Sequence, residues 1–260
     1  MIVAGVDIGS VTAKAVILKD GKLAGSSVHP TGADCNQAAL AVLAEASKQA
    51  GVDQKEIKYI MATGYGRRAI DFGNETITEI SSNAKGAAYL GSSKGKVHTI
   101  IDVGGQDTKA ISLDENGNIL NFVMNDKCAA GTGRFLEVIA RALQEDMESF
   151  SKLSLKSTNP VAINSTCTVF AESEVVSLIA QRVKKEDIIA GIHESIAKRI
   201  VEMAKAVNVK DVVFFDGGGA KNAGLKQAIE TELGFEVFVT QYPQIVVALG
   251  AALIAQERVR

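Results

Sequence analysis

DIGSVTAK, residues 7–14, recurs in the same chain as DVGGQDTK, residues 102–109, and this repeat decides the fold. Each copy is flanked by two apolar, strand-like stretches: residues 2–6 and 15–18 for the first copy, and residues 97–101 and 110–113 for the second. A polar turn that contains glycine follows each second stretch. Strand, glycine-containing loop and strand in this order predict a β-hairpin in each copy.

The loops at the tips of the two hairpins have the composition of phosphate-binding loops. Glycine lets the backbone approach a ligand closely, and loop N–H groups can point at phosphate oxygens. Asp7 and Asp102 end the first strand of each hairpin, where a carboxylate can hold a water of Mg²⁺. Two such hairpins facing each other would bind one polyphosphate from both sides. The alternative for each Asp and Lys is an ordinary salt bridge at a strand end.

Composition excludes several classes of function. The chain has 260 residues, of which 47% are hydrophobic and 5% aromatic, with no Trp and a net charge of −2. This balance predicts no binding to nucleic acid and no attraction to an anionic membrane. We expect no signal peptide, no membrane span and a cytoplasmic location, because the first residues are not basic and no apolar run is long enough to cross a bilayer. Three cysteines do not make a secreted disulfide framework.

Hydrophobic periodicity and breaker residues divide the chain into two α/β halves. The expected helices are residues 36–50, 79–90, 132–147, 171–182, 185–207 and 222–233, and a last one that begins at Pro243. The expected further strands are residues 58–62, 211–215 and 235–240. We predict a first lobe at residues 1–95, joined by the C-terminal helix at 243–260, and a second lobe at residues 96–242. Gly-rich strand ends would line a cleft between them.

A third glycine-rich segment, DGGGAKN at residues 216–222, follows a predicted strand and opens a predicted helix. It is neither the dinucleotide pattern G-x-G-x-x-G nor a Walker A loop. Three glycines in a row still permit very close backbone approach, so a purine or a ribose–phosphate could lie against them, with the helix N-terminus directed at the anion. The alternative is a simple tight turn between strand and helix.

Together, the two D-[IV]-G-x-x-x-x-K hairpins, the DGGGAKN turn and the Ala-rich C-terminal helix resemble the actin, sugar-kinase and heat-shock ATPase superfamily. The resemblance implies a two-lobed, actin-like ATPase fold of the ribonuclease-H-like kind, with duplicated mixed-sheet domains around a nucleotide cleft. ATP or ADP would bind there with Mg²⁺. Residues expected to contact the phosphates are Ser10, Val11, Thr12, Ala13, Lys14, Gly104, Gly105 and Gln106. Gly217, Gly218 and Gly219 would lie under the adenosine, and Gln244 would reach the nucleotide. Either Gln106 or Asp107 would orient the attacking water.

Two cysteines lie in small-residue loops ahead of predicted helices. Cys128 stands in NDKCAAGTGRF and Cys167 in NSTCTVFAESE. The positive end of a helix dipole stabilises a thiolate, which is the form that binds a metal. The alternative is a buried free cysteine that acts as a small hydrophobic residue, as we expect for Cys35. Because a [4Fe–4S] cluster takes four thiolates, two chains related by a two-fold axis would supply two each.

The cysteine segments, placed between the hairpins and DGGGAKN, resemble the activator ATPases of 2-hydroxyacyl-CoA dehydratases and the related ATPase subunits of benzoyl-CoA reductase. The chain is most similar to free-standing activators of the 2-hydroxyglutaryl-CoA dehydratase kind. The resemblance implies a homodimer with one [4Fe–4S] cluster on Cys128 and Cys167 of both chains, and one ATP site per chain. An electron from reduced ferredoxin or flavodoxin would pass to the dehydratase component at low potential.

The implied mechanism is coupling between nucleotide and electron transfer. A coupling of about 3 kcal/mol between two sites is ordinary and corresponds to roughly 130 mV for one electron. A small-molecule kinase on the same scaffold, with Asp107 as its base, is the main alternative. A third possibility is an actin-like filament protein, whose contacts would give open polymers instead of a closed dimer.

Overall fold

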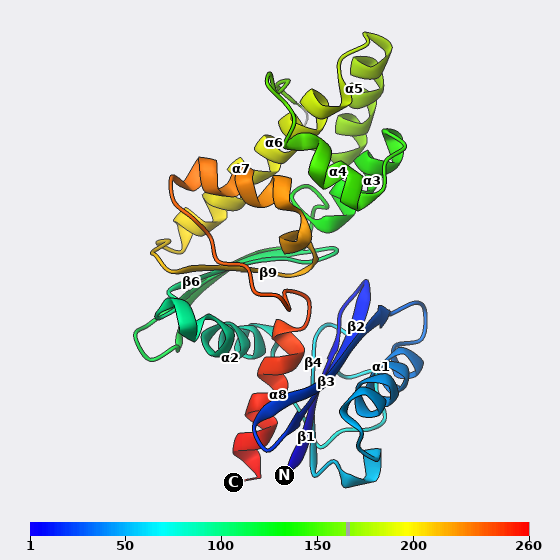
Figure 1. The fold of residues 1–260 in the computed structure, drawn as a ribbon, viewed down its shortest axis with the longest axis vertical. Coiled ribbons are helices and arrows are strands. Elements are labelled where there is room, and N and C mark those ends of the chain that lie inside the picture. Colours follow the sequence, from blue (N-terminus) through cyan, green and yellow to red (C-terminus); the bar gives the residue numbers. More distant parts are fainter. Residues whose placement is uncertain (165–166, 260) are drawn as a thin grey trace. The chain divides into compact units, whose positions relative to one another are not determined.

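The computed structural model describes residues 1–164 and 167–259, and the chain divides into two compact units. Unit 1 comprises Met1–Val97, Leu113–Ile119 and the chain from Thr240 onward. Unit 2 comprises His98–Ser112 and Leu120–Val239. Each unit has its own mixed β-sheet and its own helices (Figure 1). The predicted α/β class with two mixed sheets is therefore confirmed.

Unit 1 is built on a five-stranded sheet in the order β3-β2-β1-β4-β5. Its strands are β1 (Ile2–Ile8), β2 (Thr12–Lys19), β3 (Lys22–Pro30), β4 (Tyr59–Thr63) and β5 (Glu75–Thr76). β1 and β2 form the first predicted hairpin and run antiparallel, whereas β4 runs parallel to β1 on its other side. β3 was not expected from the sequence.

Helices cover both faces of this sheet. Side chains alternate between the faces of a strand, so Ala4 and Val3 belong to different clusters of buried residues. On one face α1 (Cys35–Ala50) packs over β2 and β3, and on the other α8 (Val246–Arg258) packs over β1 and β4. α2 (Glu79–Gly91) packs against α8. The last helix thus belongs to the first unit.

α8 begins later than the sequence indicated. We expected Pro243 to open the helix, but residues 243–245 form a turn, and Val246 is the first helical residue. The Ile245 N–H donates to the Tyr242 carbonyl at 3.2 Å, a bond that tightens this turn before the α-helical bonds begin. Gln244 therefore lies in the turn ahead of the helix.

Unit 2 repeats the hairpin arrangement in a four-stranded sheet, with the order β8-β7-β6-β9. Its strands are β6 (Thr99–Val103), β7 (Thr108–Leu113), β8 (Ile119–Asn125) and β9 (Val213–Asp216). Its helices are α3 (Gly133–Ala142), α4 (Met147–Ser154), α5 (Thr168–Ala180), α6 (Lys185–Ala206) and α7 (Ala223–Leu233). Short 3-10 turns are η1 (Gln54–Glu56) and η2 (Ser92–Lys94) in unit 1, and η3 (Gly218–Lys221) in unit 2.

Two predicted elements of unit 2 were wrong. The single helix expected at residues 132–147 is two helices, because Gln144 adopts φ +58 after α3 and Asp146 accepts the Glu148 and Ser149 N–H groups as the N-cap of α4. The strand expected at residues 235–240 is only a bridge between Phe238 and Phe214. β8, on the outer edge of the sheet, was missed. Among the described helices, we find no candidate for a membrane span.

Candidate functional site

The first hairpin carries an ion pair at the end of its strands. Asp7 and Lys14 are register partners, and Lys14 Nζ lies 2.9 Å from Asp7 Oδ2. The Gly9 N–H donates to the Thr12 carbonyl at 3.1 Å, which closes the loop between them. Ser10 at the tip of the loop is exposed, whereas the Ala13 side chain is fully buried. Any ligand contact of Ala13 would therefore come from its backbone.

The second hairpin repeats this geometry with one more carboxylate. Asp102 and Lys109 are register partners, and the Gly104 N–H donates to the Asp107 carbonyl at 2.9 Å. Lys109 is 1% exposed, and its Nζ lies 3.2 Å from Asp102 Oδ2 and 2.9 Å from Asp107 Oδ1. One buried ammonium therefore binds two carboxylates, whereas Gln106 in the same loop is exposed.

The DGGG turn lies directly against this hairpin. Gly217 has φ +80, and a Cβ there would come within 2.5 Å of Asp102 Oδ1. A Cβ on Gly219 would come within 2.5 Å of the Val103 side chain. Only glycine permits this approach, so the structure brings Asp102, the loop at residues 104–107 and Gly217–Gly219 together within unit 2. Ser10–Lys14 and Gln244 belong to unit 1.

Unit 1 contains a counterpart of the DGGG turn to which we assigned no role from the sequence. β4 ends at Thr63, the register partner of Asp7, as β9 ends at Asp216, the register partner of Asp102. Gly64 then has φ +87, and a Cβ on it would come within 2.3 Å of Asp7 Oδ1. The shared signal in the sequence is a strand followed by glycine, any residue and glycine, in TGYG at 63–66 and DGGG at 216–219.

The two cysteines of interest both lie in unit 2, in different settings. Cys167 is exposed and is itself the N-cap residue of α5. Cys128 is half-buried and lies in the loop before α3, whose N-cap is Thr132. Cys167 therefore lies at the helix terminus itself, whereas Cys128 lies in the loop before the helix. Within residues 1–164 and 167–259, no three potential metal ligands cluster.

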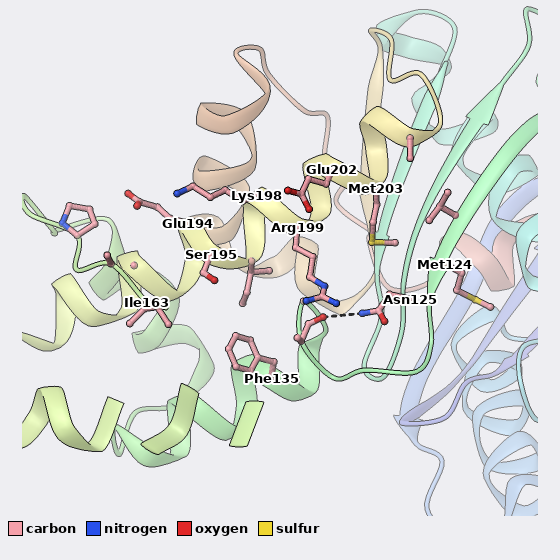
Figure 2. A pocket seen from close by; sticks show the side chains of 18 residues that line it. Met124, Asn125, Phe135, Ile163, Glu194, Ser195, Lys198, Arg199, Glu202 and Met203 are labelled. Atoms are coloured by element: carbon pink, nitrogen blue, oxygen red, sulfur yellow. Dashed lines mark hydrogen bonds between the residues drawn. The ribbon is translucent and has the colours of Figure 1, made fainter. Parts of the chain in front are cut away.

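A pocket lies beside the loop that carries Cys128. Asn125 Nδ2 donates to the carbonyls of Cys128 and Ala130, both at 2.9 Å, and so holds this loop at the end of β8. Figure 2 shows Arg199 of α6 extending toward Asn125, with Met203 and Phe135 on the pocket wall. The cavity has a volume of about 790 Å³. Its polar wall carries both signs of charge, since Glu194, Lys198 and Glu202 also line it.

Comparison with known proteins identifies the family. The model of the BadF/BadG/BcrA/BcrD ATPase family matches residues 4–255, which include the loops of both hairpins, all three cysteines and both glycine turns. The chain belongs to this family. The predicted resemblance to activator ATPases is confirmed by the relatives at 43–46% identity.

Relatives of this ATPase are similar over nearly their whole length. The chain is 43% identical to the 2-hydroxyisocaproyl-CoA dehydratase activator of Clostridioides difficile, covering 96% of this chain and 93% of that protein. It is 46% identical to the activator of lactoyl-CoA dehydratase of Anaerotignum propionicum, covering 97% and 96%. It is 43% identical to the (R)-2-hydroxyglutaryl-CoA dehydratase activating ATPase of Acidaminococcus fermentans, covering 98% and 96%.

Solved structures of dehydratase activators have nearly the same fold as this chain. The activator of 2-hydroxyisocaproyl-CoA dehydratase from Clostridium difficile with bound ADPNP has a TM-score of 0.94 at 43% identity, covering 99% of this chain and 95% of that one. Component A of the Acidaminococcus fermentans dehydratase also has a TM-score of 0.94, at 41% identity, covering 99% and 98%. A ROK family glucokinase from Streptomyces griseus, at 14% identity and a TM-score of 0.61, covering 99% and 100%, shares the fold alone.

One buried histidine of the ATPase supports the DGGG turn. Asn222, the last residue of DGGGAKN, caps α7 by accepting the Leu225 N–H at 3.0 Å. Its Nδ2 lies 2.9 Å from His193 Nε2 in α6, so Nε2 acts as the acceptor and Nδ1 carries the hydrogen of the neutral ring. Burial lowers the pKa of His193 from 6.5 to about 3. The cap of α7 therefore depends on a histidine that stays uncharged.

This dependence predicts a loss of stability in acid. Between pH 6.5 and about 3 the unfolded chain binds a proton at His193 that the folded ATPase does not bind. As the pH is lowered through this window, His193 should reduce the free energy of unfolding by about 1.4 kcal/mol per pH unit. Above pH 6.5 it should contribute no pH dependence. Thermal unfolding at pH 7 and pH 5 measures the slope.

The matched variants are His193→Gln, which removes the titrating ring, and His29→Gln on β3. His193→Gln should flatten the dependence of melting temperature on pH, whereas His29→Gln should leave the slope of the wild type. An unchanged slope in His193→Gln would show that other groups carry the acid sensitivity.

Proposed function

We propose that this BadF/BadG/BcrA/BcrD family ATPase binds and hydrolyses Mg²⁺·ATP and thereby activates a 2-hydroxyacyl-CoA dehydratase by one-electron transfer. The observation that carries the proposal is identity of 43–46% over at least 96% of this chain to activators of three such dehydratases. These identities do not separate the three acyl-CoA systems. 2-Hydroxyglutaryl-CoA dehydratase remains our prediction for the partner.

Each unit has its own set of residues for the nucleotide in this proposal. In unit 1, Ser10–Lys14 contact phosphates and Asp7 holds a water of Mg²⁺. Asp7 suits this role because its Oδ1 is buried and has no hydrogen-bond partner among the described residues. In unit 2, Gly104–Gln106 contact phosphates, Asp102 holds a second Mg²⁺ water and Gly217–Gly219 lie under the adenosine. In unit 1, Gln244, in the turn before α8, is a further residue for nucleotide contact.

Gln106 is the residue that orients the hydrolytic water in this proposal. The sequence left the choice between Gln106 and Asp107 open. The Asp107 carboxylate is bound to Lys109 at 2.9 Å and sits beside the loop backbone, since a Cβ on Gly104 would come within 2.4 Å of its Oδ1. The Gln106 side chain is exposed in the same loop. An amide that both donates and accepts can position a water without removing its proton.

Replacing Gln106 with Ala should therefore lower the rate constant of ATP hydrolysis by about 10²-fold, the scale on which a misplaced reactant slows a reaction. The affinity for ADP should stay near that of the wild type. Single-turnover hydrolysis and ADP titration check the two quantities separately. Hydrolysis at the wild-type rate in Gln106→Ala would return the role to Asp107.

Cys128 and Cys167 would hold one [4Fe–4S] cluster per homodimer, two thiolates from each chain. Both thiols suit this, because neither is fully buried, and the described residues contribute no third ligand to a site within one chain. α5, which begins at Cys167, also leaves apolar side chains exposed: Val169, Phe170, Val176 and Ile179. A second copy would bury such a face. The bound cluster would supply one-electron transfer, with reduced ferredoxin or flavodoxin as the donor.

The direct test is reconstitution. The anaerobically purified protein is mixed with each of the three dehydratases, reduced ferredoxin and Mg²⁺, and dehydration is followed with ATP, ADP or a non-hydrolysable ATP analogue. We expect dehydration with ATP only. A colourless protein that activates none of the three and instead phosphorylates a small molecule would contradict the proposal. We expect the protein to act in the cytoplasm, where these partners would be found.

A further inference from the structure

Several buried side-chain atoms of unit 1 lack a hydrogen-bond partner among the described residues, and two of them are oxygens on neighbouring strands. They are Oδ1 of Asp7, a residue 2% exposed, and Oγ1 of Thr63, a residue 0% exposed. Buried polar atoms are nearly always paired with protein or ordered water, and leaving one unpaired lowers stability. Two such atoms in one place therefore indicate a bound group.

The sheet places these two residues side by side. Asp7 on β1 and Thr63 on β4 are register partners in parallel strands, and adjacent strands lie only about 4.8 Å apart. The Asp7 carboxylate is also oriented. Its Oδ2 faces Lys14 on β2, whereas Oδ1 faces the other side, because a Cβ on Gly64 would come within 2.3 Å of it. Oδ1 is thus directed at the turn that begins with Thr63.

The chemistry of this pair fits a hydrated divalent cation. Mg²⁺ takes oxygen ligands and keeps several of its waters, so a carboxylate and a hydroxyl beside each other can each bind a metal water. A hydroxyl is suited to this because it both donates and accepts, and it adds no charge beside the Asp7–Lys14 ion pair. Unit 2 has a carboxylate in place of this hydroxyl. The register partner of Asp102 is Asp216, whereas the register partner of Asp7 is Thr63.

We propose that Thr63 is a positioning residue for the metal: its hydroxyl holds, together with Asp7 Oδ1, a water of the divalent cation that accompanies the nucleotide. This inference rests on the proposed function, since it requires a metal–nucleotide complex in unit 1. It also explains why Gly64 and no larger residue follows Thr63, because a side chain there would occupy the space beside Oδ1.

The test compares Thr63→Val, which keeps the shape and removes the hydroxyl, with Thr63→Ser, which keeps the hydroxyl. The control is Thr99→Val. Thr99 is also 0% exposed, but its hydroxyl donates to the Lys210 carbonyl at 3.0 Å. Mn²⁺ is titrated into each protein with ADP present, and free Mn²⁺ is counted by its EPR signal. The melting temperature of each protein is measured without metal or nucleotide.

Thr63→Val should weaken Mn²⁺ binding about tenfold, the scale for losing an outer-shell partner of a metal. Its metal-free melting temperature should equal or exceed that of the wild type, because an unpaired buried hydroxyl is removed. Thr63→Ser should bind Mn²⁺ nearly as the wild type does. Thr99→Val should keep the Mn²⁺ affinity and melt about 2–4 °C lower, because it loses a satisfied hydrogen bond.

Two results would overturn the inference: wild-type Mn²⁺ affinity in Thr63→Val, or a metal-free melting temperature that falls in Thr63→Val as it does in Thr99→Val. The second would assign Thr63 a structural role only. Failure of the wild type to bind ADP and Mn²⁺ at all would instead contradict the proposed function. The outcomes for the two proposals are therefore distinguishable.

Discussion

Serine in place of Cys128 or Cys167 should abolish the proposed [4Fe–4S] cluster and with it all activation of the dehydratase. A homodimer that loses one thiolate per chain retains two of the four that a [4Fe–4S] cluster takes. Iron and sulfide analysis of the anaerobically purified variants should give values near zero, and the visible absorption should be lost. ADP binding should persist, because the residues proposed to bind the nucleotide belong to the hairpins and glycine turns and not to the cysteine loops.

Cys35→Ser is the matched control. Cys35 is also a free, half-buried cysteine, but it opens α1 and packs against the core of unit 1. The variant should keep the wild-type iron content and activation, with at most a small change in stability. Iron retained in Cys128→Ser or Cys167→Ser at the wild-type level would contradict the assignment of the cluster to these residues.

Methionine in place of Lys109 should destabilise unit 2 by about 3–5 kcal/mol, the usual penalty for removing one partner of a buried ion pair. Lys109 is fully buried between Asp102 and Asp107, whose carboxylates would lose their bonds to the ammonium. Methionine fills a similar volume, so the loss would come from charge and not from a cavity. Urea unfolding followed by circular dichroism measures the change in the free energy of unfolding.

Two further lysines calibrate this result. Lys14→Met breaks the ion pair with Asp7 at a site where Lys14 is 15% exposed, so the destabilisation should be smaller. Lys127→Met breaks a pair in which the lysine side chain is 88% exposed, and stability should not change measurably. The order Lys109, Lys14, Lys127 is the prediction, and a Lys109→Met protein as stable as the wild type would contradict it.

Much of the fold could be predicted because its signals are local. Both hairpins follow from short apolar runs around a glycine loop, and most helix boundaries fall within three residues of those expected. The helix at 132–147 was wrong for a specific reason. Apolar residues recur at helical spacing as far as Leu143, but periodicity does not reveal that Gln144 turns left-handed or that Asp146 starts a new helix.

The missed strands have a different cause. β3 and β8 are outer strands, and β8 is mostly exposed, so neither has the continuous apolar pattern of a buried strand. The predicted strand at 235–240 has suitable residues, but only Phe238 bridges to β9, which is itself short. Strand pairing depends on a partner elsewhere in the chain, and a single segment does not reveal that partner.

Residues close together in the chain sufficed for the Asp7–Lys14 and Asp102–Lys109 pairs, because a hairpin brings its own two strands into register. Local sequence did not predict the pairing of Asp7 with Thr63, which requires β4 to lie parallel to β1. It also did not predict the close contact of Gly217 with Asp102. Parallel neighbours are joined by long connections, so their register is decided by packing across the whole unit. The sequence by itself therefore determined the two ion pairs, because each forms within one hairpin. The tertiary structure decided where the glycine turns and Thr63 lie, because their neighbours are distant in the chain.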